Sequence, residues 1–316
     1  MVAERTKLAT ALKANGDLKL VAYMMAGHPN KKRSIEVGKR LAASGVAAIE
    51  IGIPHSDPLA DGPVIQRAGQ IALEHGMTVS GALEVAEAVA AEGVPVALMT
   101  YINPVLSHDP RKFAAEAAQA GVSGVIVPDL PIEEAEPVAG WLRSASLDTI
   151  FMVAPTTPPD RIATICSHSS GFVYCVTVTG ITGARKELPE GMPELFGEVR
   201  KHTHLPIAAG FGISRPEHMR SLRGTVDAAA VGSAIVDEID HGGDAGCREP
   251  LPHVDRPLGR RMTRHEVGDQ LQIAPLRLER SFEPRSFSHH RPNPCPCRRG
   301  RKGTRRSSRR APAHAR

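Results

Sequence analysis

Short apolar runs rich in β-branched residues alternate with longer amphipathic segments from residue 18 to about residue 240. Compact apolar runs of this kind predict buried strands, whereas apolar residues at three-to-four spacing predict helices. The predicted strands cover residues 18–26, 47–53, 95–101, 124–129, 148–154, 171–178, 206–211 and 227–232. Helical stretches such as KRSIEVGKRLAASG and VSGALEVAEAVAAEG lie between them, and several end at glycine, a common helix stop.

Eight strands that alternate with helices are typical of repeated βα units around a parallel sheet. Their span, roughly 230 residues, is close to the size of about 250 residues that is usual for a closed barrel. The sequence therefore predicts an α/β fold, a (β/α)8 TIM barrel. The alternative is a doubly wound open sheet, which usually has a glycine-rich turn after its first strand. Here that place holds AGHPNKK, which supplies a single glycine and favours the barrel.

The composition of the chain changes after Gly246. Residues 247–316 contain 18 Lys+Arg against 6 Asp+Glu, while residues 1–246 contain 21 against 28. We predict a catalytic barrel domain over residues 1–246 and a disordered, Arg/Pro-rich tail over residues 247–316. The tail is either a solvated extension or a nucleic-acid-binding arm. Cys295 and Cys297 lie too close together for a zinc finger, so we expect no metal site.

The chain has no run of about 18 uninterrupted apolar residues, and its first residues, MVAERTKLATALKANGD, are charged throughout. Five cysteines without a regular spacing favour a reducing compartment. We therefore expect a cytoplasmic protein. Because only 3% of the residues are aromatic, Ala, Val, Ile and Leu must fill most of its core.

Two acidic residues stand where a barrel carries its chemistry, near the carboxyl ends of strands and on the loops that follow. Glu50 lies inside an apolar strand, where burying a carboxylate is costly. Asp61 ends PHSDPLAD, a loop that prolines make stiff. Two carboxylates in one pocket suit acid/base work, because burial keeps one protonated while the other stays ionised. The alternatives are a core carboxylate satisfied by its surroundings for Glu50, and a turn or helix N-cap for Asp61.

Three glycine-bearing segments predict a phosphate site in the second half of the chain: TGITGAR (179–185), AGFGIS (209–214) and VGSAIV (231–236). Glycine lets backbone N–H groups approach an anion closely, and barrels often bind phosphate after their last two strands. Gly232 and Ser233 would open a short helix whose N-terminus favours negative charge. The segments match neither a Walker loop nor GxGxxG.

The three tyrosines, Tyr23, Tyr101 and Tyr174, all lie in or at the ends of predicted strands. That placement suits an aromatic ligand, although a plain core role is the alternative for Tyr23. His28 and His55 flank prolines in loops, and we expect both on the surface.

The run AAIEIGIPHSDPLADGPVIQRA (47–68) resembles the signature of tryptophan synthase alpha chains. MTYINPV, VPDLPIEE, VTGITGAR, AGFGIS and VGSAIV follow in the matching order, so the resemblance covers roughly residues 5–240. It implies a carbon–carbon lyase of L-tryptophan biosynthesis, which reversibly cleaves indole-3-glycerol phosphate to indole and glyceraldehyde 3-phosphate. The resemblance also implies that this chain needs no cofactor of its own.

The resemblance implies a role for each matching residue. Glu50 would shuttle protons, and Asp61 would bind the ring N–H and stabilise the indolium cation. Tyr174 would lie near the reacting carbon, and Thr182 would help to seat Asp61 when its loop closes. The remaining substrate-binding residues would be Tyr23, Met99 and Tyr101 at the indole end, and Gly183, Gly212, Gly232 and Ser233 around the phosphate.

The resemblance further implies a partner. Family members work with a beta chain that carries pyridoxal phosphate and joins indole to serine, in an alpha2beta2 heterotetramer. Pro54 and Asp57 would lie towards that partner, although Asp57 in SDP also fits an ordinary turn.

The sequence departs from the family near residue 240, where family members continue with a long final helix. That helix is expected to be short or absent here, and the abrupt change in composition suggests a shifted reading frame. Two alternative functions remain. One is another phosphate-binding barrel enzyme, such as an isomerase or an indole-glycerol-phosphate synthase, although a synthase would be expected to place a lysine near the acids. The other is a nucleic-acid-binding protein that acts through its basic tail.

Overall fold

The computed structural model describes residues 6–13, 17–176, 191–210, 213 and 216–241, and its strands form one parallel sheet that closes into a barrel. The strand order is β5-β4-β3-β2-β1-β9-β8-β7-β6. The strands are β1 Lys19–Met25, β2 Ala48–Gly52, β3 Val96–Met99, β4 Gly124–Ile126, β5 Asp148–Ile150, β6 Met152–Val153, β7 Val173–Val176, β8 Ile207–Gly210 and β9 Ala228–Val231.

The two ends of this strand order are halves of one strand. β5 and β6 are separated only by Phe151, and β5 pairs with β4 while β6 pairs with β7. The N–H of Tyr174 donates to the carbonyl of Phe151 at 3.1 Å, so hydrogen bonding continues across the break. In the part of the chain that the structure describes, the barrel thus has eight physical strands, each within one of the eight predicted segments, and the predicted (β/α)8 architecture is confirmed.

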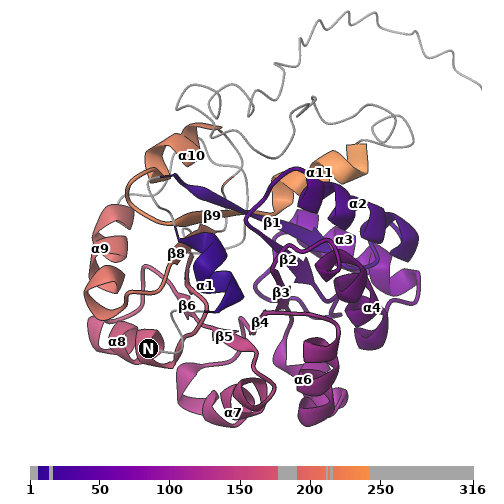
Figure 1. Ribbon diagram of the computed structural model, residues 1–316, viewed down its shortest axis with the longest axis horizontal. Coiled ribbons are helices and arrows are strands. Elements are labelled where there is room, and N and C mark those ends of the chain that lie inside the picture. The colour runs from indigo at the N-terminus through magenta and orange to yellow at the C-terminus, as the bar shows by residue number, and fades with distance from the viewer. Residues whose placement is uncertain (1–5, 14–16, 177–190, 211–212, 214–215, 242–316) are drawn as a thin grey trace, which may run out of the picture. The chain divides into compact units, whose positions relative to one another are not determined.

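Most helices surround the strands on the outside, whereas the first, α1, lies across one end of the barrel (Figure 1). The helices are α1 Lys7–Leu12, α2 Lys31–Ala43, α3 Pro63–Glu74, α4 Val79–Ala90, α5 Ile102–Ser107, α6 Pro110–Gln119, η2 Ile132–Glu134, α7 Glu136–Ser144, α8 Pro159–His168, α9 Met192–His202, α10 Pro216–Leu222 and α11 Ser233–His241. The helix α11 begins at Ser233, as the sequence predicts, and has nine residues within the described part of the chain. The predicted boundary at residue 246 and the tail lie outside the described residues.

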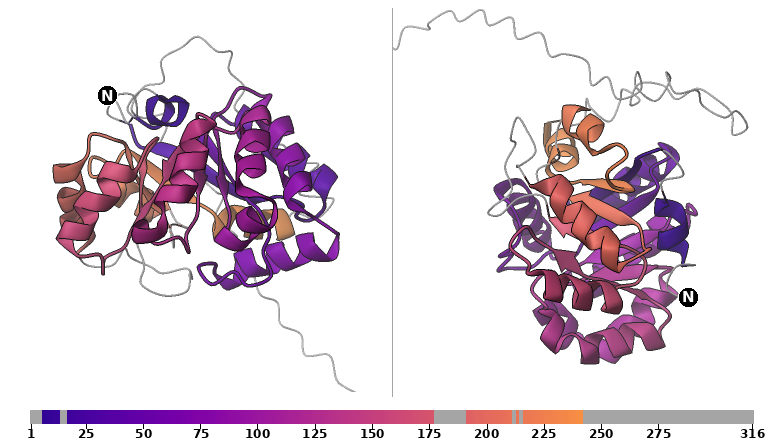
Figure 2. Two further views of the ribbon diagram at one scale, coloured as in Figure 1. Left: turned by 90° about the horizontal axis from the view of Figure 1, so that it is seen from below. Right: turned by 90° about the vertical axis from the view of Figure 1, so that its left-hand side faces the viewer.

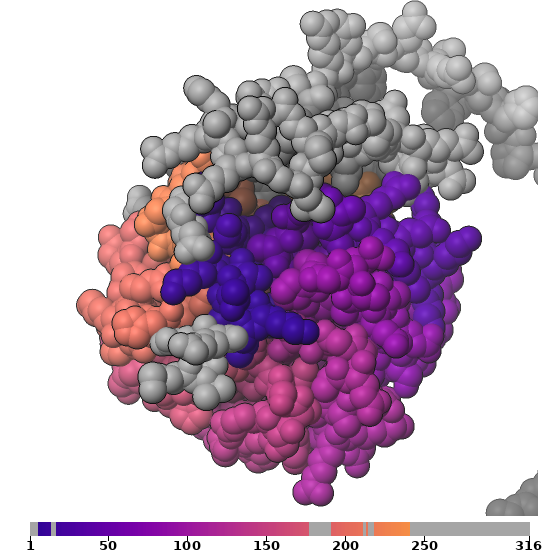
Figure 3. All heavy atoms as spheres, in the orientation of Figure 1, coloured from indigo at the N-terminus to yellow at the C-terminus, as the bar shows by residue number. Residues whose placement is uncertain are grey.

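Helix α1 was not among the predicted helices, and it closes the amino-terminal end of the barrel. Thr6 caps it by accepting a hydrogen bond from the N–H of Ala9 at 3.2 Å. Leu8 and Leu12 are fully buried, and a Cβ on Gly124, the first residue of β4, would come within 2.9 Å of Leu8. Figure 2 shows α1 beyond one end of the strands, and Figure 3 shows this indigo segment across the middle of that face. The opposite, carboxyl-terminal end of the strands is left for chemistry.

Aliphatic side chains fill the interior, as the low aromatic content predicts. One cluster of buried residues packs α2, α3, α4 and α6 against β1–β4, and a second packs α8 and α9 against β6–β8. Within the described residues, no helix is long and apolar enough to cross a membrane, and no group of His, Cys, Asp and Glu is arranged to hold a metal ion.

Candidate active site

Glu50 lies in the middle of β2, between Tyr23 of β1 and Ala97 of β3 in the strand registers. Alternation along β2 turns Ile49 and Ile51 to the opposite side of the sheet from Glu50. The side chain of Glu50 is buried, and its Oε2 atom has no hydrogen-bond partner among the described residues. The alternative of a fully satisfied core carboxylate is therefore not supported. Burial, and to a smaller extent the charge of Asp61, raises the pKa of Glu50 to about 8.

Asp61 ends the loop that joins β2 to α3, and it is also buried. The loop is held to its helix by Gln66, whose side-chain amide donates to the carbonyl of Asp61 at 2.9 Å. The N-cap of α3 is Gly62, so the alternative of Asp61 as the N-cap residue is wrong. Burial raises the pKa of Asp61 to about 6, although a hydrogen bond from Tyr101 works in the opposite direction.

The two acids lie close enough to interact, since the charge of Asp61 contributes to the raised pKa of Glu50. Their pKa values, about 8 for Glu50 and about 6 for Asp61, lie on either side of neutral pH. At neutral pH Glu50 carries a proton, while Asp61 is mostly ionised. The pair can therefore donate a proton at one point and stabilise a positive charge at another.

Three buried tyrosines surround the acids. Burial raises the pKa of Tyr23 and of Tyr174, and the charges of Glu50 and Asp61 raise both further. A Cβ on Gly52 would lie 2.2 Å from the hydroxyl of Tyr23, so the absence of a side chain at the end of β2 makes room for that hydroxyl.

Tyr174 occupies an equivalent space on the other side of the barrel. A Cβ on Gly210 of β8 would lie 2.3 Å from the hydroxyl of Tyr174. Met99, the last residue of β3, is buried as well. The predicted indole-lining residues Tyr23, Met99 and Tyr101 thus lie, with Tyr174, in the buried interior of the barrel. Tyr23 is in β1, Met99 in β3 and Tyr174 in β7, and Tyr101 lies two residues after the end of β3.

The predicted phosphate site is described only in part. Gly232 follows β9, and a Cβ on it would lie 3.4 Å from Cβ of Tyr23, which places this backbone beside the tyrosine. Ser233 begins α11, and the N–H of Val236 bonds to the carbonyl of Gly232 at 3.0 Å. Thr182, Gly183 and Gly212 lie outside the described residues.

The loop from β2 to α3 also carries the two residues expected to face a partner. Asp57 is exposed, whereas Pro54 is buried, and a Cβ on Gly69 of α3 would lie 4.0 Å from Cβ of Pro54. Leu59, in the same loop, has 76% of its surface exposed. The loop therefore has a buried acid at one position and exposed residues a few positions away.

The expectation that His28 lies on the surface is wrong. His28 is buried, and its Nε2 atom lies 2.8 Å from a carboxylate oxygen of Asp240 in α11. Arg67 of α3 donates to the other oxygen of the same carboxylate, so Asp240 connects the last described helix to α3 and to the segment between β1 and α2. His55 is half-buried, and its ring lies 5.2 Å from that of Tyr101 with 32° between the planes.

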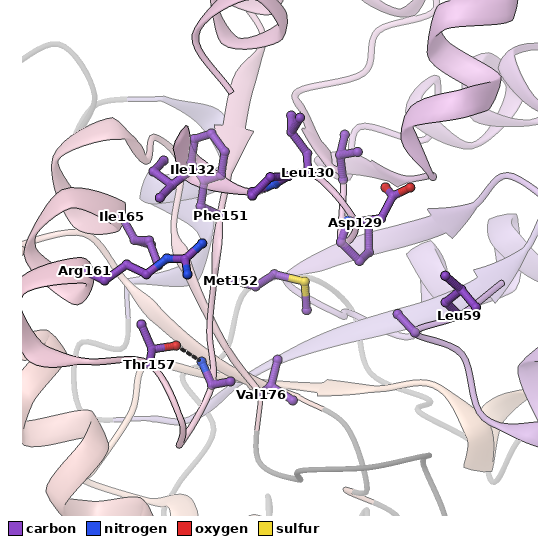
Figure 4. Close-up of a pocket in the computed structure, with 15 residues that line it drawn as sticks. Leu59, Asp129, Leu130, Ile132, Phe151, Met152, Thr157, Arg161, Ile165 and Val176 are labelled. Atoms are coloured by element: carbon purple, nitrogen blue, oxygen red, sulfur yellow. Dashed lines mark hydrogen bonds between the residues drawn. The ribbon is translucent and has the colours of Figure 1, made fainter. Parts of the chain in front are cut away.

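A pocket of about 710 Å³ opens where β4, β6 and β7 end, and sequence reasoning did not predict it (Figure 4). Residues of the Asp61 loop, of VPDLPIEE and of the region from β6 to α8 line it: Leu59, Ala60, Val127, Pro128, Asp129, Leu130, Pro131, Ile132, Phe151, Met152, Ala154, Thr157, Arg161, Ile165 and Val176. Most of these side chains are apolar, and the pocket adjoins the loop that carries Asp61. It is large enough for a drug-sized ligand and suits an apolar one.

A closed parallel barrel, with two buried acids of different pKa at the strands and loops of one end, defines an enzyme of the (β/α)8 class that uses acid/base chemistry. Comparisons with known proteins identify the branch of that class. A family model described as Tryptophan synthase alpha chain matches residues 9–250. The tryptophan synthase alpha chain of Carboxydothermus hydrogenoformans is 46% identical over 233 residues, which are 72% of this chain and 86% of the relative. That of Chloroflexus aurantiacus is 41% identical over 78% of this chain and 96% of the relative.

Solved structures agree. Tryptophan synthase of Mycobacterium tuberculosis is similar with a TM-score of 0.70 and 36% identity, over 74% of this chain and 90% of that one. A chain of the Pyrococcus furiosus tryptophan synthase α2β2 complex is similar with a TM-score of 0.67 and 36% identity, over 71% of this chain and 91% of that one. The chain belongs to the tryptophan synthase alpha chain family. Its reaction is therefore the lyase reaction of that family, and the comparisons favour neither another barrel enzyme nor a nucleic-acid-binding protein.

Proposed function

We propose that Glu50 is the proton-transfer residue of this lyase and that Asp61 stabilises the cation formed on the indole ring. Glu50 would give its proton to the ring carbon that bears the glycerol phosphate side chain. The positive charge would then lie on the ring nitrogen, where the carboxylate of Asp61 accepts a hydrogen bond from the ring N–H. The observation that carries this proposal is the buried acid pair, one member protonated and the other ionised at neutral pH.

The carbon–carbon bond would break in the next step. After giving up its proton, the carboxylate of Glu50 accepts the proton of the neighbouring side-chain hydroxyl. The oxygen forms a carbonyl, the electron pair of the breaking bond returns to the ring, and the indolium becomes neutral indole. Glu50 is protonated again at the end, and the products are indole and glyceraldehyde 3-phosphate, so no cofactor of this chain is consumed.

The remaining residues would bind the two ends of the substrate. Tyr23, Met99 and Tyr101 would enclose the indole, and Tyr174 would lie near the reacting carbon. The backbone at Gly232 and Ser233 would hold the phosphate, because the N-terminus of α11 favours an anion. The resemblance assigns Gly183 and Gly212 to the same cradle, and it assigns Thr182 to seating Asp61.

We further propose that a tryptophan synthase beta chain, carrying the pyridoxal phosphate, docks beside Asp57 and Pro54 in an alpha2beta2 assembly in the cytoplasm. The exposed apolar side chains of Leu59 and Leu106 support this docking surface, as does the similarity to a chain of the Pyrococcus furiosus α2β2 complex. The apolar pocket beside this loop would then provide a dry route for indole.

The test is an assay of indole release from indole-3-glycerol phosphate, with and without a beta chain. We expect Glu50→Gln and Asp61→Asn each to lower kcat by at least about 100-fold, as is usual when a general acid or a charge-stabilising group is removed. Glu87→Gln is the matched control, because Glu87 is an exposed acid on α4 and should leave the rate unchanged. Full activity in both site variants would refute the proposed roles.

A further inference from the structure

Tyr101 does more than line the site, because its hydroxyl contacts the loop that ends at Asp61. Its side chain is buried two residues after the end of β3, and its hydroxyl accepts a hydrogen bond from the N–H of Ala60 at 3.0 Å. Ala60 is the residue before Asp61, and the same hydroxyl acts on the carboxylate of Asp61 as a hydrogen-bond donor, which lowers the pKa of that acid. A phenol hydroxyl has one proton and two lone pairs, so it can donate its proton to the acid while a lone pair accepts from the backbone N–H.

Three loops at the carboxyl end of the barrel meet at this tyrosine. The N–H of Ile102, the next residue, donates to Oδ1 of Asp129 in the loop after β4 at 2.9 Å. The ring of His55, from the loop after β2, lies against the ring of Tyr101. The backbone and the ring of Tyr101 are therefore fixed by the loops on either side, and its hydroxyl has a defined position when Asp61 reaches it.

The hydrogen bond opposes the effect of burial. Taking a carboxylate out of water favours the neutral acid, and burial is the largest influence on the pKa of Asp61. The hydrogen bond from Tyr101 lowers that pKa. The other titratable groups that face Asp61 are Glu50 of β2, Tyr23 of β1 and Tyr174 of β7.

We propose that Tyr101 is a positioning residue: its hydroxyl, fixed on the backbone N–H of Ala60, acts on the neighbouring carboxylate of Asp61 and holds it in the orientation that the reaction needs. This inference goes beyond the lining role given to Tyr101 above, and it rests on the proposed role of Asp61. The hydroxyl acts on the reaction only through Asp61. Its loss therefore changes the pH at which Asp61 works, which loss of a packing contact would not do.

The direct test is the titration of Asp61 in the full chain, followed by carbon-13 NMR of labelled aspartate carboxyl groups and assigned by the signal that Asp61→Asn removes. In Tyr101→Phe we expect the pKa of Asp61 to rise by about one unit, the effect of losing one hydrogen bond to a charged group. Tyr23→Phe is the matched control, because it removes a buried hydroxyl near the acids that is not among the hydrogen bonds acting on Asp61. An Asp61 titration that Tyr101→Phe leaves unchanged would overturn the proposal.

A second variant guards against a folding defect in Tyr101→Phe. Replacement of Tyr101 by 3-fluorotyrosine keeps the ring and the hydroxyl but makes the phenol a stronger donor. The pKa of Asp61 should then fall, in the direction opposite to that in Tyr101→Phe. A rise, or no change, would contradict the proposed bond.

Activity supplies the test of the underlying function. If Asp61 acts as a carboxylate, Tyr101→Phe should lower kcat about fivefold at pH 6 and hardly at all at pH 8, because a shift from about 6 to about 7 changes the ionised fraction mainly below neutrality. KM should change less than kcat at pH 6. A shifted NMR titration with an unshifted activity profile would support the hydrogen bond from Tyr101 and overturn the catalytic role of Asp61.

Discussion

Glu50→Gln should stabilise this protein although it slows the reaction at least about 100-fold, and the gain in stability should depend on pH. Burial raises the pKa of Glu50 from 4.5 to about 8, so the folded state holds a proton that the unfolded chain releases. Stability is therefore lost as the pH rises from the unfolded pKa through the folded one. At about 1.4 kcal/mol for each pKa unit, the cost of Glu50 is about 3 kcal/mol at pH 7 and about 5 kcal/mol above pH 8. Glutamine resembles the protonated acid in shape and carries no charge, so the variant avoids this cost.

The assay is urea unfolding of the wild type and of Glu50→Gln at pH 5, 7 and 9, with Glu87→Gln as the exposed control. We expect the free energy of unfolding of Glu50→Gln to exceed that of the wild type at pH 9, and the difference to shrink towards zero at pH 5. Natural active sites often give up stability in this way. A difference between Glu50→Gln and wild type that is the same at pH 5 and pH 9 would refute the reasoning, because a titrating buried carboxylate cannot produce it.

Three further predictions follow from the same structure. The rate of indole release should have a bell-shaped dependence on pH, falling below about pH 6 as Asp61 gains a proton and above about pH 8 as Glu50 loses one. A rate that does not change between pH 5 and pH 9 would contradict this. Gly52→Ala should lower the free energy of unfolding, measured with heat or urea, by about 1–3 kcal/mol and should raise KM, since the added Cβ would lie 2.2 Å from the hydroxyl of Tyr23. An unchanged free energy of unfolding together with an unchanged KM would contradict this prediction. A chain cut after Gly246 should keep the lyase activity in the indole assay, which tests the proposed division at that residue, and complete loss of activity in a folded truncation would reject it.

The strands and the barrel could be predicted because their signals are local. Each strand is a compact apolar run, and the observed strands lie inside the predicted segments at all eight places. Glu50 stood out for a related reason, as an acid flanked by Ile49 and Ile51. A carboxylate in such a run has a free-energy cost that an ordinary core position would not carry.

Contacts between distant segments could not be predicted. Nothing near Tyr101 in the sequence shows that its hydroxyl lies on Ala60 and Asp61, which are 41 and 40 positions earlier. The wrong prediction for His28 has the same origin, since its ring contacts Asp240 in the last described helix. In both cases the partner is brought in by strand order and loop packing, which a residue's neighbours in the chain do not encode.

Local patterns thus established the kind of fold, the number of strands and which acids were candidates, because periodicity and the cost of a buried charge can be judged from a few neighbouring residues. The protonation states of Glu50 and Asp61 were decided only by the closed barrel. Burial raises the pKa of both acids; the charge of Asp61 raises that of Glu50 further, and the hydrogen bond from Tyr101 lowers that of Asp61. These effects depend on distances between residues that are far apart in the chain, so they exist only once the sheet has closed.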